Sequence, residues 1–195
     1  MRWLMQKNQF VRHTHFVGAP VSPDLEDFVN DCRDWMSNNF ACKSGHGTPP
    51  HITLLAPFSL PREFNEGDVF ETATAAFSEC VQKNVIPFAA EISGFGAFAE
   101  STLFFNVVDS KNWQDAHSIF AKKFSANILS HGKKSARKFF PHLTIANRDI
   151  PPGTMDDALR HFSELDFKAK FNLNAICVYT RNSNGGWIEA RRFGI

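Results

Sequence analysis

Two short phrases of the sequence place a histidine two residues before a threonine. The first phrase, PHITLLA, contains His51 and Thr53, and the second, PHLTIAN, contains His142 and Thr144. Side chains alternate between the two faces of a β-strand, so each histidine is predicted to share a face with its threonine. Each phrase would then present one imidazole, which titrates near neutral pH, beside one hydroxyl group.

Two imidazoles and two hydroxyl groups around one site would suit an in-line displacement at phosphorus. A neutral histidine can take a proton from the attacking oxygen while a protonated histidine on the opposite side donates one to the leaving oxygen. The threonine hydroxyls can bind non-bridging phosphoryl oxygens and stabilise the charge of the transition state. One His-x-Thr pattern recurs easily by chance, but two copies inside matched phrases favour a shared catalytic site made of His51, Thr53, His142 and Thr144.

The elements that must position these phrases follow the same order twice. Hydrophobic periodicity and turn residues predict strand, helix, strand, helix and strand in each half, with one further strand closing the chain. The predicted strands are 11–19, 51–56, 86–93, 102–108, 142–147, 167–180 and 186–193, and the predicted helices start at 22–23 and span 66–82, 111–129 and 154–163. We therefore predict one domain over residues 1–195, with duplicated halves at about 10–98 and 99–195 whose pseudo-twofold axis brings the phrases together.

Composition limits the classes of partner. The chain has 195 residues, of which 43% are hydrophobic and 21% charged, and its net charge is +1. This charge gives no bulk attraction to nucleic acid or anionic lipid, so any polyanion site must be local. No apolar run approaches the roughly 20 residues that span a bilayer, and the N-terminus lacks a signal-peptide pattern. The four cysteines form no C-x-x-C pair, which favours free thiols and a cytoplasmic location.

On its two His-x-Thr phrases and the order of its elements, the chain resembles the 2H phosphoesterase superfamily, in particular its 2′-5′ RNA ligase-like branch, with its RNA 2′,3′-cyclic phosphodiesterases. The resemblance runs from the strand at 11–19 to the strand at 186–193, and the two phrases are its specific part. It implies an α+β fold of two pseudo-twofold-related lobes of antiparallel sheet, with outer helices and a cleft between the lobes.

The resemblance also implies an activity. Such a protein would be a metal-independent phosphodiesterase without a cofactor, which hydrolyses a 2′,3′-cyclic phosphate to a 2′-phosphate or cleaves a 2′-5′ linkage. His51 would donate a proton to the leaving oxygen and His142 would activate water, although the sequence alone leaves the two roles interchangeable.

Three further residues are candidates for substrate contact. Nucleotide-processing relatives often carry arginine directly after the second phrase, whereas here Asn147 holds that place and Arg148 follows. Arg148 would reach the phosphate only if the strand continued regularly. Tyr179 and Arg181 share a face of the strand predicted at 167–180, where the arginine could pair with phosphate and the tyrosine could stack on a base. Both could equally lie at the rim of the site.

Other features carry less weight. The basic segment 131–140 is either a positive rim that attracts a polyanion or a solvated loop. It contains Lys133, Lys134, Arg137 and Lys138. Three phenylalanines could form a base-stacking wall, although core positions are favoured for each. They are Phe16, Phe98 and Phe104. His13 and His15 have the spacing of metal ligands, but no further spaced residues complete a set, so no metal site is predicted.

Two alternatives stay open at this point. The protein could be a non-catalytic module that binds a nucleotide or RNA at the same site, or it could act in the reverse direction as a 2′-5′ RNA end ligase. Two imidazoles favour catalysis, because binding alone does not need them. In each case the expected partner is a nucleotide or short RNA with a cyclic phosphate or 2′-5′ bond, the expected state is a monomer, and no membrane is involved.

Overall fold

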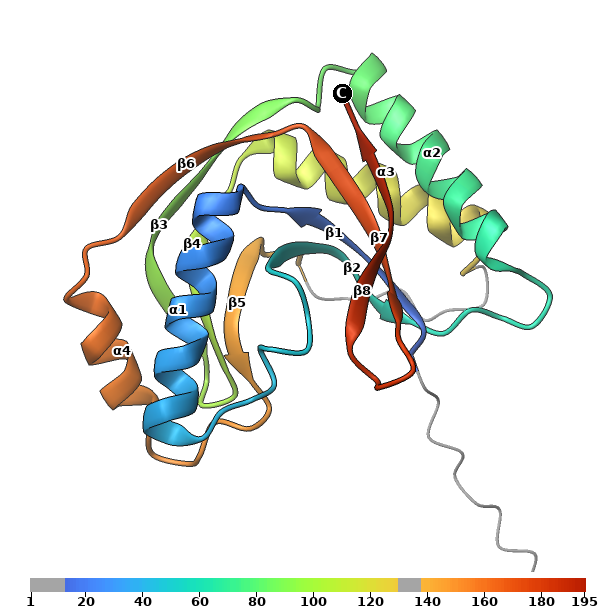
Figure 1. Ribbon diagram of the computed structural model, residues 1–195. Coiled ribbons are helices and arrows are strands. Elements are labelled where there is room, and N and C mark those ends of the chain that lie inside the picture. Colours follow the sequence, from blue (N-terminus) through green and yellow to red (C-terminus); the bar gives the residue numbers. More distant parts are fainter. Residues whose placement is uncertain (1–12, 130–137) are drawn as a thin grey trace, which may run out of the picture.

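The computed structural model describes residues 13–129 and 138–195 (Figure 1). Within these ranges the chain forms eight strands and four helices. The strands are β1 (His15–Pro20), β2 (His51–Phe58), β3 (Phe88–Phe98), β4 (Thr102–Val107), β5 (His142–Asn147), β6 (Lys168–Leu173), β7 (Ala175–Arg181) and β8 (Trp187–Gly194). The helices are α1 (Pro23–Phe40), α2 (Glu66–Gln82), α3 (Lys111–Asn127) and α4 (Met155–Ser163). No helix in these ranges is long and apolar enough to cross a membrane.

The helices begin where the sequence supplies suitable first residues. Ser22 is the N-cap of α1 and Pro23 its first residue, as predicted, because proline has no N–H to leave unpaired and its φ suits a helix. At α2 the Asn65 side chain accepts a backbone N–H from the first turn, and the Asp68 carboxylate accepts the backbone N–H of Asn65. This reciprocal pair is a capping box. The Ser110 hydroxyl accepts a backbone N–H from the first turn of α3.

All eight strands belong to one antiparallel sheet with the order β6-β3-β4-β5-β2-β1-β7-β8. The order is symmetric about the central pair, because β2 and β5 each carry one His-Thr phrase and each is flanked by three further strands. The predicted α+β fold is therefore confirmed, and its two lobes of antiparallel sheet are joined edge to edge by β2 and β5.

The two lobes exchange helices. Helix α1 connects β1 to β2 but packs on β5 of the other lobe, and α3 connects β4 to β5 but packs on β2. Helix α2 packs against α3, β7 and β8, while α4 packs on β3 (Figure 1). Because of this exchange, the lobes are joined through their hydrophobic cores as well as through the pairing of β2 with β5.

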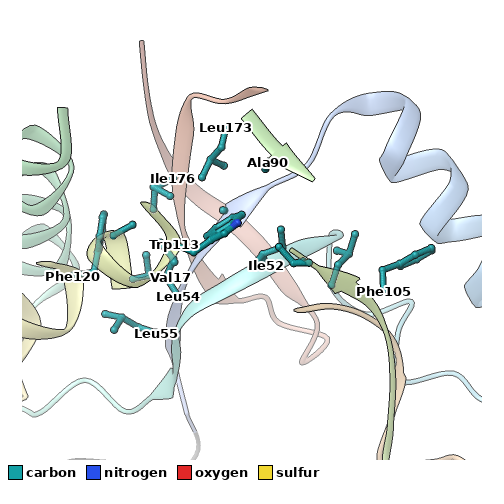
Figure 2. Packing of buried hydrophobic residues seen from close by; sticks show 14 of the residues in the cluster. Val17, Ile52, Leu54, Leu55, Ala90, Phe105, Trp113, Phe120, Leu173 and Ile176 are labelled. Carbon is teal, nitrogen blue, oxygen red and sulfur yellow. The ribbon is translucent and has the colours of Figure 1, made fainter. Parts of the chain in front are cut away.

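One large hydrophobic core lies between the sheet and the helices. It includes the side chains that alternate with the predicted catalytic residues, among them Ile52 and Leu54 on β2 and Leu143 on β5. Trp113 and Phe120 of α3 fill the core beside them (Figure 2). The helices thus cover the face of the sheet that the two phrases direct their apolar residues toward, and the histidines and threonines face the other way.

The segment 167–180, predicted as one strand, is two strands that lie in different lobes. β6 pairs with β3 at one edge of the sheet, and β7 pairs with β1 in the opposite lobe. Only Asn174 separates them, so the chain passes from one lobe to the other at this residue, as Figure 1 shows. Apolar residues hold the odd positions on both sides of Asn174, from Ala169 to Tyr179, which is why the sequence shows no break. The residues that enter the large core nevertheless change from Phe171 and Leu173 to Ile176 and Val178.

Candidate active site

The two phrases meet at the centre of the sheet. Ile52 of β2 is paired with Leu143 of β5, and both side chains are fully buried. In an antiparallel pair, the residues on either side of a paired position are also opposite each other. The pairing therefore places His51 across from Thr144 and Thr53 across from His142, all four on the face away from the core.

Both histidines are held by the same local contact. The Nδ1–H of His51 donates to the carbonyl oxygen of Pro49 at 2.7 Å, and that of His142 donates to the carbonyl oxygen of Phe140 at 2.8 Å. In the neutral ring this leaves Nε2 as a proton acceptor. The Thr53 hydroxyl lies 3.1 Å from Nε2 of His51 and donates to it. Each phrase thus directs an unprotonated ring nitrogen toward the open face.

The surroundings lower the pKa of both imidazoles, to different degrees. Burial lowers the pKa of His51 to about 4, opposed by the hydrogen bond to Pro49 and reinforced by the charges of Arg33 and His142. Burial also lowers the pKa of His142 below its ordinary value, opposed by the hydrogen bond to Phe140. Both rings are therefore neutral at pH 7 in the free protein, and His51 is the harder of the two to protonate.

Packed aromatic rings support His51. Phe16 lies 4.5 Å from the His51 ring and stacks at 4.5 Å on Tyr179, whose ring is 5.3 Å from His51. Trp187 meets Phe16 edge-on at 4.8 Å. Phe16, Tyr179 and Trp187 are all buried. Tyr179, predicted to contact substrate, thus lies behind the imidazole as part of a small core on the open face.

Arg181, the other candidate on β7, is engaged at the hairpin between β7 and β8. Its guanidinium lies over the Trp187 ring at 4.2 Å, and its Nη1 donates to the carbonyl oxygen of Gly185. The side chain is half-buried and packs on Trp187, the ring that meets Phe16 edge-on. Its contact with substrate remains a prediction.

More exposed aromatic rings surround His142. Phe98 lies 4.9 Å and Phe104 lies 5.3 Å from the His142 ring, and Phe140 lies 5.6 Å from Phe98. Phe104 is buried, as the sequence favoured, whereas Phe98 is 40% and Phe140 is 48% exposed. The site therefore has a closed aromatic side at His51 and an open aromatic side at His142.

Arg148 is not among the side chains that the strand brings to this face. β5 ends at Asn147, and Arg148 has a positive φ of 67° and an exposed side chain. The alternation on which its predicted phosphate contact depended stops one residue earlier. Lys133, Lys134 and Arg137 of the basic segment lie outside the described residues, and Lys138 is exposed.

The loop before β2 connects the two lobes at the end of the site. The Asp149 carboxylate accepts the backbone N–H groups of Lys43 and Ser44 at 2.6 and 2.9 Å and the Ser44 hydroxyl at 2.8 Å. On the other lobe, the backbone N–H of Trp187 donates to the carbonyl oxygen of Gly47 at 2.7 Å. The loop is thus fixed to the segment after β5 and to the β7–β8 hairpin.

Arg33 is the residue that sequence reasoning missed. It is 4% exposed and lies in the apolar stripe of α1, between Val29 and Met36. Its guanidinium donates to the backbone carbonyl oxygens of Thr48 at 2.9 Å and of Thr144 at 3.3 Å. A charged residue at a core position of an otherwise amphipathic helix was the available signal, because buried arginine is rare unless its charge is used.

The described residues contain no group of three or more His, Cys, Asp or Glu side chains placed to hold a metal ion. His15 lies buried next to Thr14, whose hydroxyl is 2.9 Å from its Nδ1, and its Nε2 is 3.8 Å from the Glu66 carboxylate. The four cysteines, Cys32, Cys42, Cys80 and Cys177, are buried free thiols.

Comparison with known proteins gives one family match and one curated relative. Residues 21–185 match the model of a family described as the 2′-5′ RNA ligase superfamily. A Bacillus cytotoxicus protein, provisionally named a phosphoesterase, is 26% identical over 175 residues, which are 88% of this chain and 91% of that protein.

Two solved structures share the fold over nearly their whole length. TT0787 of Thermus thermophilus has a TM-score of 0.63 and 13% identity, covering 93% of this chain and 97% of its own. E. coli LigT complexed with 3′-AMP has a TM-score of 0.60 and 14% identity, covering 94% and 98%. LigT has also been solved in complexes with NADP+ and with ATP. At these identities the structural matches establish the fold.

Proposed function

Because this chain belongs to the 2′-5′ RNA ligase superfamily, the 2H phosphoesterases, we propose that it is a metal-independent phosphodiesterase. Its substrate is a nucleotide or an RNA end. It either hydrolyses a 2′,3′-cyclic phosphate to the 2′-phosphate or cleaves a 2′-5′ linkage. The two histidines perform general acid–base catalysis, and Thr53 and Thr144 bind the phosphoryl oxygens.

The proposal rests on one observation, the pairing of β2 with β5 at Ile52 and Leu143. This pairing gathers two imidazoles and two hydroxyl groups on one open face. The local hydrogen bonds of both Nδ1 atoms leave both Nε2 atoms as proton acceptors, and that of His51 must exchange the Thr53 hydroxyl for substrate or water. A phosphoryl group between the Nε2 atoms would have a proton acceptor and a proton donor on opposite sides.

In the proposed reaction, the oxygen of a water molecule attacks phosphorus. The neutral histidine takes a proton from this water as the new P–O bond forms. The bond from phosphorus to the 3′ oxygen breaks, and the protonated histidine gives its proton to that oxygen. The products are a 2′-phosphate and a free 3′-hydroxyl, and proton exchange with solvent resets the two imidazoles. Imidazolium and hydroxyl groups supply the charge stabilisation in this scheme.

Exposed Phe98 and Phe140 support a substrate with a nucleobase. Their rings lie at the open side of the site beside His142, and stacking of a base on an aromatic ring is worth roughly 1–3 kcal/mol. LigT, which shares the fold, has been solved with three nucleotides. The net charge of +1 favours a nucleotide or short oligonucleotide over a long RNA.

The test is hydrolysis of 2′,3′-cyclic nucleotides and 2′-5′ oligoadenylate by the wild type and by His51→Ala and His142→Ala. General acid–base help is worth roughly 100- to 10,000-fold per group, so each variant should lose at least 100-fold in kcat. His161→Ala is the matched control, because His161 stacks at 3.9 Å on Trp35 between α4 and α1. Activity in the wild type should persist in EDTA.

Other outcomes identify the alternatives. Binding of the nucleotides without product release from any of them would indicate a binding module. Joining of a 2′,3′-cyclic phosphate end to a 5′-hydroxyl end, without net hydrolysis, would indicate the ligase direction. Loss of activity in EDTA together with an active His51→Ala variant would refute the two-histidine mechanism.

A further inference from the structure

A polar side chain lies on the open face of the sheet directly beside His142. Asn106 of β4 is paired with His142 of β5, and residues directly opposite each other in an antiparallel pair have Cβ atoms about 4.5–5.5 Å apart. Its neighbours Phe105 and Val107 belong to the large hydrophobic core, so Asn106 points to the face that carries the two histidines. Asn106 is half-buried and is therefore within reach of a molecule bound at His142.

A hydrogen bond to the backbone fixes the orientation of the Asn106 carboxamide. Its Nδ2 donates to the carbonyl oxygen of Phe95 at 2.8 Å. A carbonyl oxygen only accepts, so the amide nitrogen must make this contact, and Oδ1 is left as a hydrogen-bond acceptor. The pairing of β3 with β4 is irregular between Ile92 and Phe95, where Gly94 has a φ of 69°. Such bulges change the direction of neighbouring groups, and here the exposed carbonyl of Phe95 holds the carboxamide in place.

The amide oxygen lies beside the aromatic rings on the open side of the site. A Cβ on Gly96 would be 2.7 Å from Oδ1 of Asn106 and 2.9 Å from a ring carbon of Phe104. The missing side chain of Gly96 therefore leaves the space that the amide oxygen and the edge of this ring occupy together. The centroids of the Phe98 and Phe104 rings are 4.4 Å apart, and Phe98 is the exposed one of the two. A hydrogen-bond acceptor is thus fixed at the edge of the aromatic surface proposed to stack on a nucleobase.

We propose, on the basis of the proposed function, that Asn106 is a specificity-determining residue that accepts a hydrogen bond from the exocyclic amino group of a base stacked at Phe98. Cytosine and adenine carry an amino group where uracil and hypoxanthine carry a carbonyl oxygen. The amide oxygen attracts the amino group and repels the carbonyl oxygen, whereas an aromatic ring stacks on every base. The site therefore favours nucleotides of cytosine and adenine.

The test compares 2′,3′-cyclic nucleotides in matched pairs, cytidine with uridine and adenosine with inosine. The ratio of kcat/KM within each pair is the measurement, because a change that affects phosphate binding or catalysis alike for both nucleotides cancels in it. A net hydrogen bond corresponds to roughly a 2- to 12-fold preference, so the wild type should favour the amino base by this factor. In Asn106→Ala, which lacks the acceptor, the ratio should fall to about 1.

Gly96→Ala is a second variant, which keeps Asn106 in the chain. Its Cβ would displace Oδ1, so the preference for the amino base should shrink. It would also displace the ring of Phe104, but the effect on stacking is common to both bases of a pair. Asn172→Ala is the matched control, because Asn172 is an exposed asparagine of the edge strand β6. The control should keep the wild-type ratio, and thermal denaturation shows which variants are folded.

A wild type without a preference within the pairs would overturn the proposal. A folded Asn106→Ala variant that keeps the preference would also overturn it, because Asn106 would then only stabilise the irregularity of β3. If Asn106→Ala does not fold, an unchanged ratio in Gly96→Ala would overturn the proposal and a reduced ratio would support it.

Failure of the proposed function is distinguishable from failure of this inference. If the wild type hydrolyses no phosphodiester, the proposed function fails, and calorimetric titration with cytidine and uridine 2′-monophosphates then tests Asn106 by binding alone. Tighter binding of the cytidine nucleotide in the wild type, lost in Asn106→Ala, would support selection of the base. Equal binding of the two nucleotides, or no binding, would overturn it.

Discussion

Acidification from pH 7 to pH 5 is expected to destabilise the protein, and His51 should account for much of the effect. Burial and nearby positive charge lower the pKa of His51 from 6.5 to about 4 in the folded protein. In the unfolded chain the imidazole returns to about 6.5. Between these two pKa values the unfolded state binds more protons than the folded state. The contribution of neutral His51 to stability is therefore fully present above the unfolded pKa and is lost as the pH falls toward the folded pKa.

The size of the effect follows from the shift. One pKa unit corresponds to about 1.36 kcal/mol, so the full loss below pH 4 is about 3 kcal/mol. Most of the change down to pH 5 falls on the steep part of the curve, and amounts to about 1.8 kcal/mol. These are upper values, because the His51 side chain is only partly shielded from water.

The assay is urea denaturation at pH 7 and pH 5, followed by tryptophan fluorescence, for the wild type and His51→Gln. The free energy of unfolding should drop more in the wild type than in the variant, by up to about 1.8 kcal/mol. A smaller drop should remain in the variant, because burial also lowers the pKa values of His15 and His142. His13→Gln is the control, because His13 is exposed and precedes β1. Equal drops of the free energy of unfolding in the wild type and His51→Gln would refute the lowered pKa of His51 in the folded protein.

Three further predictions concern the support of the site. Gly45→Ala should lower the free energy of unfolding by roughly 1–3 kcal/mol, the range for overpacking, because its Cβ would lie 2.4 Å from the Ile145 carbonyl oxygen. Gly47→Ala is the control and should leave thermal denaturation nearly unchanged, because nothing lies within 4 Å of its Cβ position. Asp149→Asn should lower the urea midpoint at pH 7, because it weakens the hydrogen bonds to the loop before β2. These hydrogen bonds lower the pKa of the Asp149 carboxyl, so the difference from the wild type should shrink when acid protonates it. Trp113→Ala, at a fully buried position of α3, should cost roughly 3–5 kcal/mol and measurably lower Tm.

Most elements could be predicted because their signals are local. Helical spacing of apolar residues placed α2, and alternation placed β5, at the residues found in the structure. The capping residue Ser22 with Pro23 placed the start of α1. The break at Asn174 could not be predicted, because apolar residues continue at the odd positions of the sequence while the chain changes lobe and the core contacts pass to Ile176 and Val178. The predicted phosphate contact of Arg148 required the strand to continue one residue past β5, where a positive φ ends the strand pattern.

The candidate site divides in the same way. Each phrase specifies by itself that its histidine and threonine share a face, because alternation is a property of a single strand. The sequence therefore determined which four groups are available and what chemistry they suit. The tertiary structure decided that β2 and β5 are neighbours, that one side of the site is closed by aromatic rings and the other open, and that the Arg33 guanidinium contacts the backbone at Thr48 and Thr144. Strand pairing, burial and the field of a buried charge depend on residues distant in the chain, so no local pattern encodes them.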